Sequence, residues 1–294
     1  RWKEAVEAVL AQFPYLTYTL NQVEDPKSTC WIASKEQAMR YSAEHLVRWE
    51  HPLIRFIKHE PTTIEFIYHH LLMDGLGMNV LLNRLIEHLE GKVKPATYSN
   101  THLIEYNPVN TGLVIETTTR TCTIFKYRIS ENELEKISSY CESNDLSKRE
   151  FFLSSVALAH QYATIAMADV TNHPGIPGMF TELIPVQIDL NTGQRAAQEL
   201  QATLNTSIVF NYMITEIPKQ WVNGIEIQEP IFTKYPFEWQ FIDYVTHIEV
   251  AFYASVENPN AAGIFETWKN QLLQHEGTEP KTIKNNELFD DFDF

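Results

Sequence analysis

The chain has 294 residues, with 38 acidic and 23 basic side chains and a formal net charge of −15 at pH 7. This length fits one large domain or two domains of about 150 residues, and an apolar fraction of 44% is enough for a sizeable core. The negative charge argues against nucleic acid or an anionic membrane as a main partner, because both bind clustered lysine and arginine.

The patterns in the first half indicate a helix, a hairpin and a second helix. Apolar residues recur at helical spacing over residues 2–13, so the chain starts within a helical pattern and we expect upstream sequence. Residues 53–58 and 63–70 are strand-like, and the intervening "HEPT" predicts a hairpin. An apolar helical face then runs from Asp74 to Gly91. Asp74 therefore lies between strand and helix, where its carboxylate can cap the helix.

The second half follows a polar, poorly periodic stretch, residues 97–121, which we expect to be a linker. It opens with the strand-like "TIFKYRI", and two helices follow with capping-box signatures, Ser130 with Glu133 and Ser147 with Glu150. Four more strand-like runs and one helix follow, at residues 180–190, 206–215, 223–228, 246–254 and 262–275. Strands mixed with packed helices predict an α/β or α+β fold in two halves.

Two adjacent histidines stand out in "EFIYHHLLMDG", residues 65–75, at the end of the second hairpin strand. Side chains alternate along a strand, so His70 shares a face with Tyr68 while His69 points to the other face. A neutral imidazole with a pKa near ~6.5 suits removal of a proton from an amine or hydroxyl. The residues alone leave a core histidine as the commoner explanation. A metal site with Asp74 is disfavoured, because adjacent strand positions diverge.

The three cysteines, Cys30, Cys122 and Cys141, are scattered and form neither a CxxC pair nor a cluster with zinc spacing. The sequence therefore predicts a reducing, cytoplasmic environment. No apolar run approaches the ~18 residues of a membrane-spanning helix, and the first residues lack the features of a signal peptide.

The segment "HHLLMDG" resembles the HHxxxDG signature of the condensation-domain superfamily, whose fold resembles chloramphenicol acetyltransferase. The flanking "HPLIRFIK" and "LLNRLIEHLEG" are similar to the family's strand and helix around this motif, and "AVEAVLAQFPYLTYTL" resembles the helix that precedes them. In the second half, "GMFTELIPVQI" and "SIVFNYMI" resemble two family strands found in nonribosomal peptide synthetase domains. The matches come in family order and span most of the chain.

Several features depart from the family pattern. Thr17 lies near the place of the family arginine that pairs with the motif aspartate, and Arg55 on the neighbouring strand is our substitute for that ion pair. Gly77 stands where peptide-synthetase domains usually have serine. The epimerase signature EGHGRE is absent, which disfavours epimerisation, and the stretch between "IPVQIDL" and "SIVFNYM" is shorter than in the family.

The resemblance implies an α/β (two-layer α+β) fold. Two chloramphenicol-acetyltransferase-like lobes would form a V with a central channel. The first lobe, residues 1–110, would carry the motif and lack the first strand of the fold. The second lobe would span residues 120–280 and be followed by an acidic tail at 281–294.

The resemblance also implies a catalytic set of His69, His70, Asp74 and Gly75. An acyl thioester, on carrier-protein phosphopantetheine or on coenzyme A, would react with a small-molecule amine or hydroxyl, as in secondary-metabolite biosynthesis. No bound cofactor or metal would be needed. His70 would deprotonate or orient the acceptor, and the backbone amide of Gly75 would help hold the developing negative charge. Asp74 would be structural, as an ion-pair partner or as a plain helix cap.

Tyr68 and Asn211 are the expected substrate-binding residues, although a buried strand asparagine bonded to backbone explains Asn211 equally well. Two alternatives to a peptide-synthetase condensation domain remain. A free-standing O- or N-acyltransferase that uses coenzyme A would need a basic rim for the nucleotide phosphates. A catalytically inactive docking module is favoured by the lost arginine and the short second half, and opposed by the intact motif.

Overall fold

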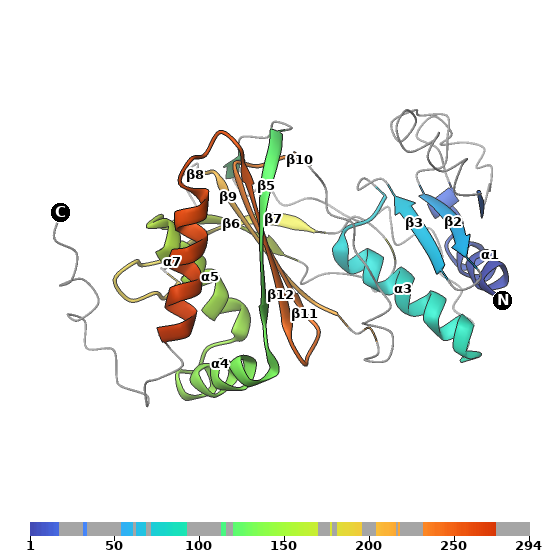
Figure 1. Cartoon of the computed structure of the whole chain (residues 1–294), viewed down its shortest axis with the longest axis horizontal. Helices are drawn as coiled ribbons and strands as arrows, with labels where there is room; N and C mark the ends of the chain where they lie inside the picture. Colours follow the sequence, from blue (N-terminus) through green and yellow to red (C-terminus); the bar gives the residue numbers. More distant parts are fainter. Residues whose placement is uncertain are drawn as a thin grey trace. The chain divides into compact units, whose positions relative to one another are not determined.

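The structure is a computed structural model of the whole chain (Figure 1). The described residues are 1–17, 32–33, 54–60, 63–68, 72–92, 113–115, 120–169, 177, 181–195, 204–215, 217 and 232–274. The expected tail at 281–294, the expected strand at 223–228 and most of the expected linker lie outside them.

The chain divides into two compact units. Arg1–Pro108 and Val170–Thr181 make the first unit, and Val109–Asp169 and Glu182–Phe294 make the second. The first division falls inside the stretch that the sequence predicts as a linker. The return of Val170–Thr181 to the first unit was not predicted, because nothing local in this short segment indicates which unit it joins.

The first unit contains a small sheet and two long helices. Its elements are α1 (Trp2–Gln12), the 3-10 helix η1 (Pro14–Thr17), β1 (Ile32–Ala33), β2 (Ile54–Glu60), β3 (Thr63–Tyr68) and α3 (Gly75–Glu90). The predicted hairpin is confirmed, with Phe56 of β2 opposite Phe66 of β3, and β1 pairs parallel to β2 on its other side. Helix α1 packs against α3, and α3 ends at Gly91, whose φ of 73° lies in the left-handed region that glycine tolerates.

The second unit is built on a seven-stranded sheet of order β10-β5-β12-β11-β9-β6-β7. Its strands are β5 (Arg120–Ile129), β6 (Thr164–Asp169), β7 (Glu182–Gln187), β9 (Ile208–Ile214), β10 (Phe232–Thr233), β11 (Phe237–Asp243) and β12 (Ile248–Ser255), with a separate parallel pair of β4 (Leu113–Ile115) and β8 (Leu204–Thr206). Helices α4 (Glu131–Ser143), α5 (Lys148–His160) and α7 (Ala261–Gln274) lie together on one face of this sheet (Figure 1). Both predicted capping boxes are confirmed, at the starts of α4 and α5.

The core of the second unit lies between the sheet and these helices. Alternate residues of β9 and β11 face it, and their aromatic rings pack against Phe152 of α5 and Trp268 of α7, both fully buried. Because side chains alternate along a strand, Asn211 and its cross-strand neighbour Gln240 point to the opposite face. Burial of large aromatic rings is the main stabilising contribution here.

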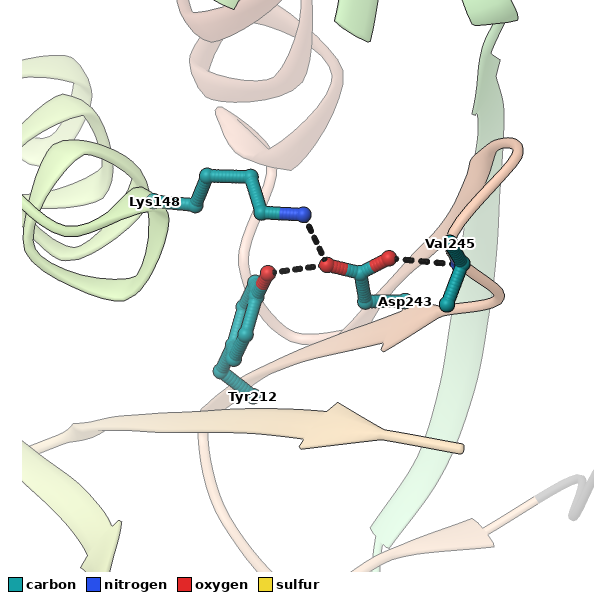
Figure 2. Close-up of polar contacts among 4 residues, drawn as sticks. All are labelled: Lys148, Tyr212, Asp243 and Val245. Carbon is teal, nitrogen blue, oxygen red and sulfur yellow. Dashed lines mark hydrogen bonds and ion pairs between the residues drawn. The ribbon is translucent and has the colours of Figure 1, made fainter. Parts of the chain in front are cut away.

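A buried carboxylate lies where β11 ends. Asp243 accepts hydrogen bonds from the Tyr212 hydroxyl at 2.6 Å and from the Val245 amide at 2.8 Å, and it forms a 2.5 Å ion pair with Lys148 of α5. Figure 2 shows the three groups converging on the two oxygens of this carboxylate. The cluster therefore connects β9, the β11–β12 turn and the start of α5.

The acid stability of the second unit is expected to depend on His160. This histidine accepts a 2.9 Å hydrogen bond from the Trp239 indole, and burial lowers its pKa to about 4. Between pH 6.5 and 4 the unfolded chain therefore binds a proton that the native histidine does not. Acidification through this window should lower the free energy of unfolding by up to about 3 kcal/mol.

The check is urea denaturation of the wild type and of His160→Gln between pH 4 and 7. Glutamine can still accept from the Trp239 indole but does not titrate, so the variant should lose less stability across this window. Parallel pH dependences in the two proteins would contradict the prediction.

Candidate active site

The "HHLLMDG" motif occupies the connection between β3 and α3. Strand β3 ends at Tyr68 and helix α3 begins at Gly75. His69 and His70 themselves lie outside the described residues, so their roles stay predictions. Tyr68, Asp74 and Gly75 are described, and they define the two ends of the motif.

Asp74 is the N-cap of α3, which confirms the predicted helix cap. It is only 2% exposed, and its Oδ1 accepts a 2.7 Å hydrogen bond from the Gly77 amide. Its Oδ2 accepts two more bonds, both 2.8 Å long, from the amide and the hydroxyl of Thr181. One buried carboxylate therefore fixes the start of α3 and ties it to a segment 107 positions later in the chain.

The predicted partner of Asp74, Arg55, is described only in its backbone. It lies on β2 opposite Ile67 of β3, and its side chain is outside the described set, so the ion pair stays a prediction. Thr17 is 2% exposed, and its hydroxyl donates to the Pro14 carbonyl at 2.7 Å. The residue near the place of the family arginine thus closes its own 3-10 turn and supplies no charge.

Tyr68 stands at the strand end of the motif, stacked on Phe66 with ring centroids 5.9 Å apart. Burial, and then the negative charge of Asp74, raise the pKa of Tyr68 to about 12. Its hydroxyl is therefore protonated at neutral pH, and it donates to the Met78 sulfur at 3.5 Å. The only hydroxyl proton of Tyr68 points to Met78, so its substrate-binding role stays a prediction, and it is not suited to act as a base.

Gly75 is the first residue of α3, where helix amides lack partners within the helix and the helix dipole is positive. The Gly77 amide in the same turn is taken by Asp74. The backbone amide of Gly75 is therefore at a position suited to donate a hydrogen bond to the negative charge that develops on a carbonyl oxygen, and this role stays a prediction.

Asn211 belongs to the second unit, in the middle of β9. It is half-buried, between the core residues Phe210 and Tyr212 in sequence but on the opposite face of the sheet. Its cross-strand neighbour there is Gln240 of β11. The prediction that Asn211 lines a substrate channel remains a prediction.

Thr181 is the site residue that sequence reasoning missed. It lies within "GMFTELIPVQI", which was matched to the family as a strand without a role for this position. A threonine just before a strand carries no local signal of a partner 107 positions away. A hydroxyl and an amide aimed at one buried carboxylate become visible only in the folded chain.

Removal of the Thr181 hydroxyl is expected to destabilise the first unit. Thr181→Val keeps the shape of the side chain and deletes one hydrogen bond to a buried carboxylate, which should lower the free energy of unfolding by about 1.5 to 3 kcal/mol. Thr181→Ser, which retains the hydroxyl, is the matched control and should lose less than about 1 kcal/mol. Chemical denaturation of both variants, alone and combined with Asp74→Ala, measures the coupling. If the double variant lost as much free energy of unfolding as the two single variants together, the contact between Thr181 and Asp74 would be contradicted.

Within the described ranges, no helix is long and apolar enough to cross a membrane. The same part of the chain holds no group of three or more histidine, cysteine, aspartate or glutamate side chains placed to bind a metal ion.

No protein-family model and no curated protein sequence matches this chain. Solved structures match it over most of its length at low identity. A structure that describes condensation domain-mediated chain release from the enacyloxin polyketide synthase has a TM-score of 0.63 at 13% identity, over 96% of this chain and 76% of that one. The first condensation domain of the calcium-dependent antibiotic synthetase, in complex with a substrate analogue, has a TM-score of 0.60 at 11% identity, over 94% and 87%.

The epimerization domain from the third module of tyrocidine synthetase B is also similar, with a TM-score of 0.61 at 11% identity, over 93% of this chain and 87% of that one. The expected mixed α/β architecture is confirmed by these matches and by the large mixed sheet. At such identities the similarity establishes a fold and leaves the reaction to the site residues.

Proposed function

We propose that this chain, which has the condensation-domain fold, is a condensation-type acyltransferase. It transfers an acyl group from a thioester to an amine or hydroxyl acceptor. The observation that carries the proposal is the anchored Asp74, held by Gly77 and Thr181, in an intact "HHLLMDG" on this fold. Strand β3 ends directly before the motif and the capped helix α3 begins at its last residue, and in the proposal these two elements hold the histidines in position, as positional catalysis requires.

In the proposed reaction, His70 takes a proton from the acceptor, or orients it, as the acceptor attacks the thioester carbonyl. A carbon–nitrogen or carbon–oxygen bond forms, the carbon–sulfur bond breaks, and the thiol leaves with a proton. The Gly75 amide stabilises the negative charge that develops on the carbonyl oxygen. Tyr68, whose hydroxyl would have to turn away from Met78, and Asn211 are the proposed substrate-binding residues.

The proposed donors are a carrier protein with a phosphopantetheine thioester or an acyl-coenzyme A, and the proposed acceptor is a small molecule. Epimerisation is not proposed, because the sequence lacks the EGHGRE signature. We also propose a reducing, cytoplasmic environment, because the three cysteines are few and scattered along the sequence.

An inactive docking module is the second candidate. Thr17 favours it, because a buried threonine bonded to its own turn replaces the charge expected near this place. In that case the chain would bind a carrier protein and catalyse no transfer.

Mass spectrometry of reaction products, with a panel of acyl-carrier and acyl-coenzyme A donors and of amine and hydroxyl acceptors, tests the proposal. We expect an amide or ester product with the wild type and little with His70→Ala. A product from carrier-bound donors alone supports a peptide-synthetase role, and a product from coenzyme A donors alone supports a free-standing acyltransferase. Carrier binding without turnover of any donor would replace the proposal with the docking module.

A further inference from the structure

The second unit contains a cavity of about 340 Å³ that no part of the proposed reaction uses. Its lining comes from the first turns of α5, from β6, and from the residues that follow β7 at the edge of the sheet. It therefore lies on the helix-covered face of the sheet, opposite to the face of Asn211. Its volume is at the lower end of the range of pockets that bind small molecules.

Part of the cavity lining is apolar. Leu153 of α5, Met167 of β6 and Ile188 after β7 are buried members of the core, and all three line the cavity. Leu146, just before α5, adds a fourth apolar side chain. This surface suits a hydrocarbon body.

The lining also includes an incompletely bonded arginine. One terminal nitrogen of Arg149, Nη2, donates to the Ala168 carbonyl at 2.7 Å and lies 3.6 Å from the Asp169 carboxylate. Its Nε is buried and has no hydrogen-bond partner in the described part of the chain. A buried donor without an acceptor is unfavourable, so an acceptor supplied by a ligand would complete this guanidinium.

A second arginine lies at the rim. Arg195 is exposed, its backbone forms an isolated bridge with Ile188, and its side chain lines the cavity. Glu150 contributes the opposite charge, but its carboxylate is bonded to the amide and hydroxyl of Ser147 in the capping box. Asp169 already balances Arg149, and no ion pair is seen for Arg195 in the described part of the chain, so the lining offers one guanidinium to an anionic group, which favours a single carboxylate over a phosphate dianion.

We propose that this cavity binds a small monocarboxylate with a hydrocarbon body. The carboxylate accepts hydrogen bonds from Arg149 Nε and from the Arg195 guanidinium, and the hydrocarbon body packs on Leu153, Met167 and Ile188. Arginine is suited to this task, because its fixed donors match the geometry of a carboxylate. The proposal does not depend on the acyltransfer reaction.

Titration calorimetry of the full chain with octanoate tests the site, with octanamide as the neutral analogue and acetate as the anion without a hydrocarbon body. We expect octanoate to bind about tenfold or more tightly than either. Arg195→Gln should reduce octanoate affinity to that of octanamide, and Arg149→Lys, which keeps the charge but loses Nε, should also weaken it. Lys136 is an exposed residue of α4 outside the cavity. Lys136→Gln also removes one positive charge, and it should leave the octanoate affinity unchanged.

Methyl NMR of the methionines locates the ligand. The Met167 resonance, assigned by its loss in Met167→Leu, should shift on addition of octanoate. Three results would overturn the proposal: no octanoate binding at millimolar concentration, equal losses in Arg195→Gln and Lys136→Gln, or binding that leaves Met167 unchanged. Melting curves of each variant without ligand separate lost binding from lost folding.

Discussion

Replacement of His70 by alanine is expected to lower turnover by about 10² to 10⁴, the usual contribution of a positioned general base. The motif places His70 on the face of the strand that also carries Tyr68, because side chains alternate. The Tyr68 hydroxyl is protonated at neutral pH, as any tyrosine is, and its pKa raised to about 12 makes it still less able to replace the imidazole as a base. The measurement is the rate of product formation with a donor that the wild type turns over.

His69→Ala and Asp74→Ala are the matched controls for His70→Ala. Both should lose stability, by about 1 to 3 kcal/mol, because they remove packing or hydrogen-bond partners. The Asp74 loss has a structural basis in the bonds from Gly77 and Thr181. Melting curves beside the turnover assay separate the two kinds of defect. Full activity of His70→Ala would show that the site works by positioning alone and that no base is needed.

Replacement of Asp243 by alanine is expected to have the largest effect on stability, a loss of about 3 to 5 kcal/mol in the free energy of unfolding. The Asp243 side chain is 2% exposed, and its removal would leave the Lys148 ammonium and the Tyr212 hydroxyl without their acceptor (Figure 2). The turn would also lose the bond from the Val245 amide, and Val245 has a positive φ of 70°, which is unfavourable for a β-branched residue. Urea denaturation followed by circular dichroism gives the value.

Lys148→Met tests whether the cost comes from burial of the carboxylate or from the ion pair. This variant leaves the buried carboxylate without its cation but with its bonds from the Tyr212 hydroxyl and the Val245 amide, so we expect it to lose less than Asp243→Ala. Tyr212→Phe removes one bond to the same oxygen and should lose about 1 to 2 kcal/mol. An Asp243→Ala variant as stable as the wild type would contradict the structural role of this cluster.

The sequence determined the elements whose signals are local. The helical spacing in the first residues, the turn between β2 and β3, and the capping boxes of Ser130 and Ser147 all depend on residues within a few positions of one another. Each of these predictions is confirmed. The N-cap role of Asp74 belongs to the same class, because a cap acts on the amide three residues later.

Strands β6 and β11 were missed for different reasons. In "TIAMAD" the central residues are buried on both faces of the strand, so the segment lacks alternation and merges with the apolar helix before it. In "FEWQFID" aromatic and polar residues do alternate, and this pattern was available to predict β11. Strand β6 therefore carries no periodic signal, whereas β11 carries the alternation that is typical of a half-buried strand.

The sequence by itself determined the motif, the two-part organisation and the helix cap, since these depend on composition or on residues close along the chain. Only the tertiary structure decided that Thr181 holds Asp74, that Lys148 and Tyr212 share Asp243, and that Arg149 lines a cavity with Arg195. Each of these depends on which segments the fold brings together. Hydrogen bonds and ion pairs act over a few ångströms in space, and no local pattern records a partner that is distant in sequence.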